Sequence, residues 1–344
     1  MIKQKEKNLR KLVTPYEQSE TRNSVKQLVN TLVPFFVLWF FAYQSLTVSY
    51  FLTLFFSVIA AGFLVRTFII FDDCCHNSFF RNKKANRIVG NITGLLTLFP
   101  YNQWKYSHSV HHASSGNLDK RGVGDIWLMT VDEYVAAPMA LKIQYRLYRN
   151  PIVLFGFGPI YAFLILNRFN RKGARRKERM NTYLTNVLIV AIVSLGCYLI
   201  GWQAFLLVQG PIFYISGVLG IWLFYVQHTF EDSYFEENKD WEYVMAAVEG
   251  SSYYKLPKVL QWLTGNIGYH HVHHLSPKVP NYKLEEAHKN TTPLQHVPTI
   301  TLKTSLQSLK FRLWDEEGKK FVQYKDIKYI TVKKNNSTVI STQK

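Results

Sequence analysis

The chain has 344 residues, 15% of them aromatic, and carries 18 more positive than negative charges at neutral pH. Its mean hydropathy is close to zero, but its charges lie between long uncharged stretches, which favours a membrane protein with basic loops over a soluble one. Three cysteines, two of them adjacent, exclude a disulfide framework and indicate a reducing compartment. Charges within the first 26 residues exclude a cleaved secretory signal there.

Two long segments predict paired transmembrane helices. Residues 27–65 contain no Asp, Glu, Lys, Arg or His, and residues 180–230 contain only His228 of these types. At about 1.5 Å per residue, the first segment reaches almost twice the thickness of a hydrocarbon core of about 30 Å, and the second reaches more than twice that thickness. The turns are expected near residues 44–49 and 201–211.

We therefore predict an all-α integral membrane protein with four full spans, interfacial helices and a cytosolic histidine-rich catalytic cap. The predicted parts are a cytosolic N-terminal arm (1–26), a first hairpin (27–71), a catalytic segment (72–179), a second hairpin (180–230), a second catalytic segment (231–296) and a cytosolic C-terminal tail (297–344). Within the tail, residues 299–302 and 329–332 have strand-like sequences. Before the tail, His288 and His296 are expected at the surface.

Two shorter uncharged stretches, 88–103 and 151–167, are each interrupted by two glycines. Both are short for a span and are predicted to lie at the interface or to re-enter the membrane. The most basic segment, 168–179, follows the second stretch. The positive-inside rule places it, both termini and the catalytic face in the cytoplasm, in a multi-pass protein of the cell membrane.

The histidines carry the chemical signal. The spacing H-x-x-H-H occurs at His108, His111 and His112 and again at His270, His273 and His274. On a helix, these offsets bring each trio to one face. His76 and His228 follow the two hairpins, so eight candidate ligands meet at one side of the membrane, whereas His271 lies off the face of its trio.

This ligand set predicts a metal centre, although imidazole by itself leaves zinc, copper, nickel and iron open. Six imidazoles from the two trios exceed the needs of one tetrahedral zinc, which favours two metals. Asp119 and Asp125, in the loop after the first trio, are candidates to orient metal-bound imidazoles through hydrogen bonds. Solvated loop charges are the alternative for these two carboxylates.

With hairpins that bracket three histidine motifs, the chain resembles the membrane-bound, acyl-lipid fatty-acid desaturase family over nearly its whole length, most specifically at residues 256–284. The resemblance implies two non-haem irons, dioxygen, and a ferredoxin-type or flavodoxin-type electron donor. It implies a cis double bond inserted into saturated acyl chains of membrane phospholipids, and no role for nucleic acid. The implied metal ligands and catalytic residues are His76, His108, His111, His112, His228, His270, His273 and His274, with Asn266 reaching the site through a water.

One motif departs from the family. The first motif normally begins with histidine in the pattern H-D-C-x-H, but residues 72–76 here are Asp-Asp-Cys-Cys-His. Asp72 is a candidate metal ligand, because carboxylate also binds non-haem iron. Asp73 is a candidate to orient a ligand. Alternatively, the substitution removes one iron and the chain is a catalytically impaired variant or pseudoenzyme.

Two other functions compete with desaturation. A hydroxylase on the same histidine cage would differ only in its product. A divalent-metal transporter would need ionisable residues within its spans, near the midplane, and the two hairpins contain none there.

Overall fold

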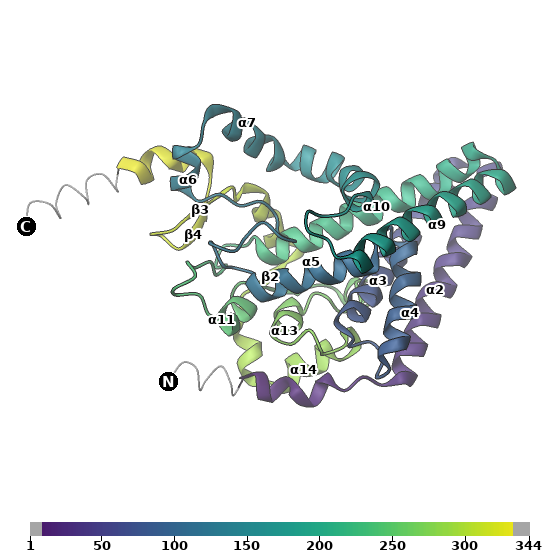
Figure 1. The fold of residues 1–344 in the computed structure, drawn as a ribbon, viewed down its shortest axis with the longest axis horizontal. Coiled ribbons are helices and arrows are strands. Elements are labelled where there is room, and N and C mark those ends of the chain that lie inside the picture. Colours follow the sequence, from purple (N-terminus) through teal and green to yellow (C-terminus); the bar gives the residue numbers. More distant parts are fainter. Residues whose placement is uncertain (1–8, 333–344) are drawn as a thin grey trace, which may run out of the picture.

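The computed structural model describes residues 9–332, so the ends of the predicted arm (1–8) and tail (333–344) lie outside it. Four of the described helices are long and apolar enough to cross a membrane: α2 (Thr21–Gln44), α3 (Tyr50–His76), α9 (Arg176–Ile200) and α10 (Trp202–His228). They form two antiparallel hairpins that project from one side of the molecule (Figure 1). This confirms the predicted all-α membrane fold.

The two hairpins turn differently. The first turns at η2 (Ser45–Thr47), within the predicted 44–49. The predicted second turn at 201–211 is wrong beyond Gly201, because α10 begins at Trp202 and includes Pro211. Gly201 has φ 82° and ψ 142°, a conformation open essentially to glycine, so one residue makes the reversal and the following residues stay helical.

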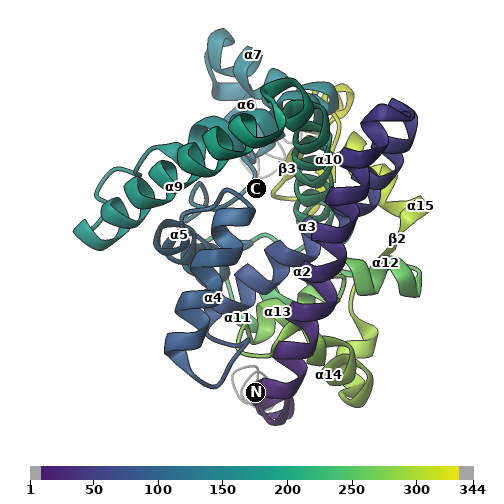
Figure 2. The same ribbon diagram turned by 90° about the vertical axis from the view of Figure 1, so that its right-hand side faces the viewer.

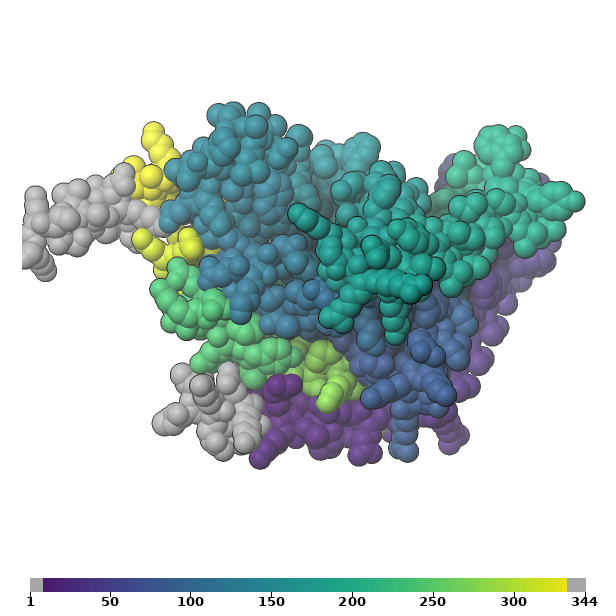
Figure 3. Space-filling model, in the orientation of Figure 1, coloured from purple at the N-terminus to yellow at the C-terminus, as the bar shows by residue number. Residues whose placement is uncertain are grey.

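Helix α3 is the central span. It packs against both α2 and α10, and Figure 2 shows it between them. The second hairpin instead exposes apolar side chains such as Leu195 and Leu206, which the bilayer would cover. The space-filling view shows this hairpin extending beyond the cap (Figure 3).

Arg66 links α3 to the cap. Its side chain is buried, donates to Thr31 Oγ1 (3.0 Å) and to the carbonyl of Trp262, and lies over the Trp262 ring at 4.0 Å. Trp262 belongs to α12 (Lys258–Leu263), just before the second histidine trio. A cation–π contact and hydrogen bonds thus fasten the cap to the span that carries His76.

The first short uncharged stretch is divided between α4 (Lys83–Leu96) and α5 (Tyr101–Ser114). With 14 residues, α4 is too short for a span, and it packs on α3. The second stretch consists of η3 (Ile152–Phe157), α8 (Gly158–Ile160), η4 (Tyr161–Ile165) and η5 (Leu166–Arg168), bent by 63° from α7 (Met139–Tyr148). The described part of the chain therefore has four spans, or five if this bent pair crosses the membrane.

The cap consists of short elements around the inner ends of α3, α5 and α10 (Figure 1). Its helical elements are η1 (Thr14–Glu17), α6 (Val131–Ala136), α11 (Tyr243–Val248), α12, α13 (His270–Leu275), η6 (Asn281–Lys283), α14 (Leu284–Asn290), η7 (Thr292–His296), α15 (Leu302–Ser305), η8 (Leu306–Lys310) and η9 (Tyr324–Asp326). Strand β1 (Tyr253–Lys255) pairs in parallel with β2 (Thr299–Thr301), placing Tyr253 opposite Thr299. Strands β3 (Leu313–Asp315) and β4 (Lys320–Val322) form an antiparallel hairpin.

Two local expectations for the C-terminal part are wrong. Residues 329–332 are helical and not a strand, although 299–301 do form one. His288 is buried, because its ring packs against Tyr253 and Tyr269, whereas His296 is exposed as expected. Tertiary contacts outweigh the local propensity in both cases.

The fold gives a topology prediction. In a Cys197→Ser background, we expect Val48→Cys and Trp202→Cys, at the hairpin turns, to react with a membrane-impermeant maleimide on intact cells. Lys172→Cys, in the basic loop, should react only after permeabilisation, because the Lys and Arg asymmetry predicts a cytoplasmic position for that loop. Labelling of Lys172→Cys on intact cells would contradict the four-span arrangement.

Candidate metal centre

Four helix ends bring the predicted histidines together. His76 is the last residue of α3, and His228 is the last residue of α10. Helix α5 carries His108, His111 and His112, and the short helix α13 carries His270, His273 and His274. Both H-x-x-H-H motifs are helical, as their spacing predicts, so each presents a row of imidazoles to the same interior space.

The first histidine group consists of His76, His108, His112 and His273, whose candidate ligand atoms all lie within 4.8 Å of one another. One member comes from α3, two from α5 and one from α13. The ring centroid of His76 lies 4.6 Å from that of His112 and 5.2 Å from that of His273. Three helices distant in sequence thus supply one group of nitrogen donors.

The second histidine group consists of His111, His228 and His274, with the same 4.8 Å limit between donor atoms. His270 adjoins this group, because its Nε2 lies 3.0 Å from His228 Nε2. The two groups touch: the rings of His112 and His274 are stacked with centroids 4.2 Å apart. All eight histidines predicted as ligands therefore lie in two adjacent groups.

Several imidazole nitrogens in these groups make no hydrogen bond. The buried ring nitrogens without a hydrogen bond are His76 Nε2, His111 Nε2, His112 Nδ1, His270 Nδ1, both nitrogens of His273, and His274 Nε2. An unsatisfied buried polar atom costs about 1–3 kcal/mol, so such a concentration is expensive unless a ligand binds there. Two groups of imidazole donors with free nitrogens fit metal ions.

Burial also sets the protonation state. Desolvation holds the pKa of His112, His270 and His274 well below its usual range, and neighbouring imidazoles lower it further. These rings are consequently neutral at physiological pH. Neutral imidazole is the form that ligates a metal, so the site needs no deprotonation step before metal binds.

Asp72, which occupies the position of the missing histidine, lies within the first group. Its Oδ1 is 2.9 Å from His108 Nε2, and its Oδ2 is 3.2 Å from His273 Nε2 and 3.6 Å from His76 Nε2. The indole N–H of Trp104 also donates to Oδ1, at 3.3 Å. The carboxylate thus reaches the same space as the imidazoles, which makes it a geometrically suitable oxygen donor.

Asp125 contacts the second group directly. The Nδ1–H of His111 donates to Asp125 Oδ1 at 2.5 Å, and the Nδ1–H of His228 donates to the carbonyl of Gly250 at 3.1 Å. In both rings, the bonded Nδ1 leaves Nε2 directed at the group. Hydrogen bonds of this kind fix the tautomer and orientation of a ligating histidine.

The other two aspartates that were expected to orient imidazoles, Asp73 and Asp119, make hydrogen bonds to asparagines. Asp73 Oδ2 accepts from the backbone N–H and the side chain of Asn281, at 2.8 and 2.7 Å. Asp119 accepts from the backbone of Asn238, at 2.7 Å. The hydrogen bonds of these two aspartates hold loops, and their contact with a metal-bound imidazole stays a prediction.

Asn266 and His271 also have partners away from the two groups. Asn266 donates to the carbonyl of Asn281 at 3.2 Å, and its contact through a water stays a prediction. His271 lies apart from both groups, with its Nε2 3.0 Å from His288 Nδ1.

Sequence reasoning missed three supporting residues. Trp104 stacks on His108, with ring centroids 5.0 Å apart and planes at 19°, and its offset of four residues on one helix is a signal that could have found it. Asn281 joins Asp73 to Gln27, which donates to Asn281 Oδ1 at 2.7 Å. Gly124 has φ +76°, and a Cβ there would lie 3.1 Å from that of His111.

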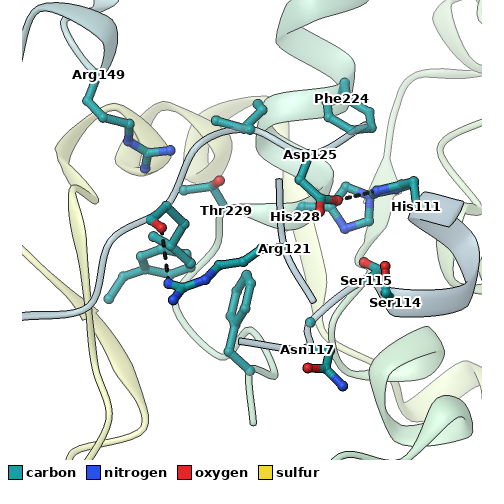
Figure 4. Close-up of a pocket in the computed structure, with 15 residues that line it drawn as sticks. His111, Ser114, Ser115, Asn117, Arg121, Asp125, Arg149, Phe224, His228 and Thr229 are labelled. Atoms are coloured by element: carbon teal, nitrogen blue, oxygen red, sulfur yellow. Dashed lines mark hydrogen bonds and ion pairs between the residues drawn. The ribbon is translucent and has the colours of Figure 1, made fainter. Parts of the chain in front are cut away.

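A cavity of about 40 Å³, partly open to solvent, borders the second group. His111, His228 and Phe224 form one side, and Arg121, Arg149 and Thr229 lie among the other lining residues (Figure 4). The cavity therefore combines candidate metal ligands, an apolar ring and two guanidinium groups.

Comparison with known proteins agrees with this site. The model of the family described as "Fatty acid desaturase" matches residues 47–301. The chain belongs to the fatty acid desaturase family. It is 69% identical to a "Fatty acid desaturase" of Bacillus subtilis, over 96% of this chain and 94% of that protein.

More distant relatives include the "sn-1 oleoyl-lipid 12-desaturase" of Synechocystis sp., 26% identical over 65% of this chain. The "sn-1 acyl-lipid omega-3 desaturase (ferredoxin)" of a Nostoc species is 27% identical over 66% of this chain. Each alignment covers 64% of the cyanobacterial protein. The chain is accordingly a membrane oxidoreductase of the acyl-lipid desaturase type.

The His111–Asp125 contact gives a prediction about metal affinity. Asp125→Asn should lower the affinity of the second group for metal by about 10- to 100-fold, because the anionic acceptor that orients His111 is lost. Competition with a calibrated chelator measures this. Asp119→Asn is the matched control, since Asp119 contacts only the loop, and equal losses in both variants would contradict the role of Asp125.

Proposed function

We propose that this desaturase inserts a cis double bond into saturated acyl chains of membrane phospholipids, using two irons, dioxygen and electrons from a ferredoxin-type or flavodoxin-type donor. The observation that carries the proposal is the pair of adjacent histidine groups, in which seven buried ring nitrogens make no hydrogen bond. These groups lie at the inner ends of apolar spans, within reach of a lipid substrate.

The residues divide between two irons. His76, His108, His112 and His273, with Asp72, would hold the first iron, and His111, His228, His270 and His274 would hold the second. Bound iron supplies the oxidising chemistry that dioxygen activation requires, because an unactivated methylene has no acidic proton for a base to remove. The protein fixes which carbons of the acyl chain lie beside the metals.

The chain's own residues would prepare the site for this chemistry. Desolvation lowers the pKa of His112, His270 and His274 and keeps them neutral, while Asp125 and the Gly250 carbonyl hold His111 and His228 by Nδ1. Apolar side chains such as Phe224 would receive the acyl chain and exclude water from the reacting carbons. We assign the catalytic work to residues 72–179 and 231–296, with the hairpins as membrane supports.

The name of one relative supports the class of electron donor, and the charge of one loop supports the orientation in the membrane. The name of the Nostoc protein includes ferredoxin, which supports a donor of that class for this chain. The basic loop at 168–179 supports a cytoplasmic catalytic face in the cell membrane, where such a soluble donor could reach it.

The activity has a direct test. In a host that makes no unsaturated fatty acids, expression of this chain should produce cis-monounsaturated chains esterified in phospholipids. Gas chromatography with mass spectrometry of the lipid classes measures the product. Hydroxy fatty acids in their place would identify a hydroxylase, and an unchanged profile despite an iron-loaded protein would refute the proposal.

Metal content is a second expectation. Protein purified under reducing, anaerobic conditions should hold about two irons per chain and no stoichiometric zinc, since the donor set exceeds that of one tetrahedral ion. Elemental analysis gives the ratio. One zinc and no iron would be incompatible with the assignment.

Asp72 provides a third test. A carboxylate adds negative charge to the first group and favours ferric over ferrous iron, so Asp72→His should raise iron retention and desaturation, by a factor on the order of ten. His273→Ala should abolish desaturation in either background. Unchanged activity and iron content in Asp72→His would show that position 72 is dispensable as a ligand.

A further inference from the structure

Arg149 is a buried cation on the wall of the cavity beside the second histidine group. Only 2% of its surface is exposed, and its Nε has no hydrogen-bond partner. One Nη donates to the carbonyl of Phe311 at 3.0 Å, and the guanidinium lies over the Tyr225 ring at 5.1 Å. A buried guanidinium is costly unless an anion or several acceptors compensate it.

The surroundings of Arg149 do not supply that anion. The ionisable groups that act on it most strongly are the hydroxyls of four tyrosines, and no carboxylate is among them. Within residues 9–332, no Asp or Glu forms an ion pair with Arg149. Its guanidinium therefore has unused capacity for an anionic ligand.

A second guanidinium lines the same cavity and is held in place by backbone. Arg121 Nε donates to the carbonyl of Leu118 at 2.7 Å and Nη1 to that of Leu128 at 3.0 Å, while its remaining Nη pairs with Glu133. Figure 4 shows Arg121 and Arg149 on the side of the cavity away from His111. Asp125 also lines the cavity, but one of its oxygens is engaged by His111.

We propose that this cavity is a subsite for the phosphate of the phospholipid substrate, with Arg149 as its principal ligand and Arg121 as its second. The inference rests on the proposed function and adds the group that the enzyme recognises. Guanidinium binds phosphate oxygens through two parallel N–H bonds, which fixes orientation as well as position. Because His111 and His228 line the same cavity, a phosphate held there sets the register of the attached acyl chain beside the second metal position.

The test compares a lipid that has a phosphate-containing headgroup with a lipid that has none. Full-length, iron-loaded enzyme in neutral detergent micelles is assayed with dipalmitoylphosphatidylglycerol and with dipalmitoylglycerol. We expect Arg149→Gln to lower kcat/KM about tenfold for the phospholipid and to leave that for the neutral lipid unchanged. The distribution of double-bond positions should also broaden for the phospholipid, since its register is less firmly held.

Arg146→Gln is the matched control. Arg146 lies one turn earlier on α7, where its Nε donates to the hydroxyl of Tyr134 at 2.6 Å, and it does not line the cavity. The preference for phospholipid should persist in this variant. An equal loss for both lipids in a folded Arg149→Gln protein would show that Arg149 only fastens the Phe311 segment, and would overturn the proposal.

Binding measurements decide the question even if Arg149→Gln does not fold. Lysophosphatidylglycerol should bind the wild-type protein at least about tenfold more tightly than monopalmitoylglycerol, and Arg121→Gln should reduce that difference. No preference in the wild type, a stronger preference for palmitate, or equally effective competition by inorganic phosphate would overturn the assignment. Absence of desaturation with both lipids would refute the proposed function, while the binding comparison would still test the cavity.

Discussion

The burial of eight imidazoles in one space is the constraint on which the rest of this structure depends. Six of the eight are buried, and desolvation holds the pKa of His112 and His270 well below its usual range, so these two rings are not stabilised as cations. Nor do the eight imidazoles satisfy one another, because seven ring nitrogens among them have no hydrogen bond. Without a metal, the site would oppose folding by several unsatisfied groups at once.

The two hairpins make this cluster of imidazoles possible, because they fix the positions of the helix ends that carry His76 and His228. Helix α3 brings Asp72 and His76 to the cap, and Arg66 on the same helix binds the segment that precedes α13. Asn281, in η6 after α13, connects the cap to α3 again through Asp73. The motif aspartate at 73 therefore supports the metal centre from behind, whereas Asp125 supports it by direct contact with an imidazole.

The two histidine groups are chemically unequal. In the first group, the Asp72 carboxylate lies against the Nε2 atoms of two imidazoles, whereas in the second group the Asp125 carboxylate binds His111 through Nδ1 and leaves its Nε2 free. A charged oxygen donor and a neutral nitrogen donor stabilise different oxidation states of a transition metal. The cavity with Arg149 opens beside the second group, so the proposed contact with substrate and the altered ligand set lie at different metal positions.

Much of this protein follows from its sequence. The long uncharged segments determined two hairpins because a bilayer admits only segments with satisfied backbone, and the H-x-x-H-H spacing determined two faces of donors because a helix repeats every 3.6 residues. The sequence could not assign partners to the aspartates: Asp125 meets His111, while Asp73 and Asp119 hold loops. Nor could it show that His288 is buried or that Arg149 lies beside His228 in one cavity. Those contacts join segments far apart in the chain, and only tertiary packing decides which of them meet.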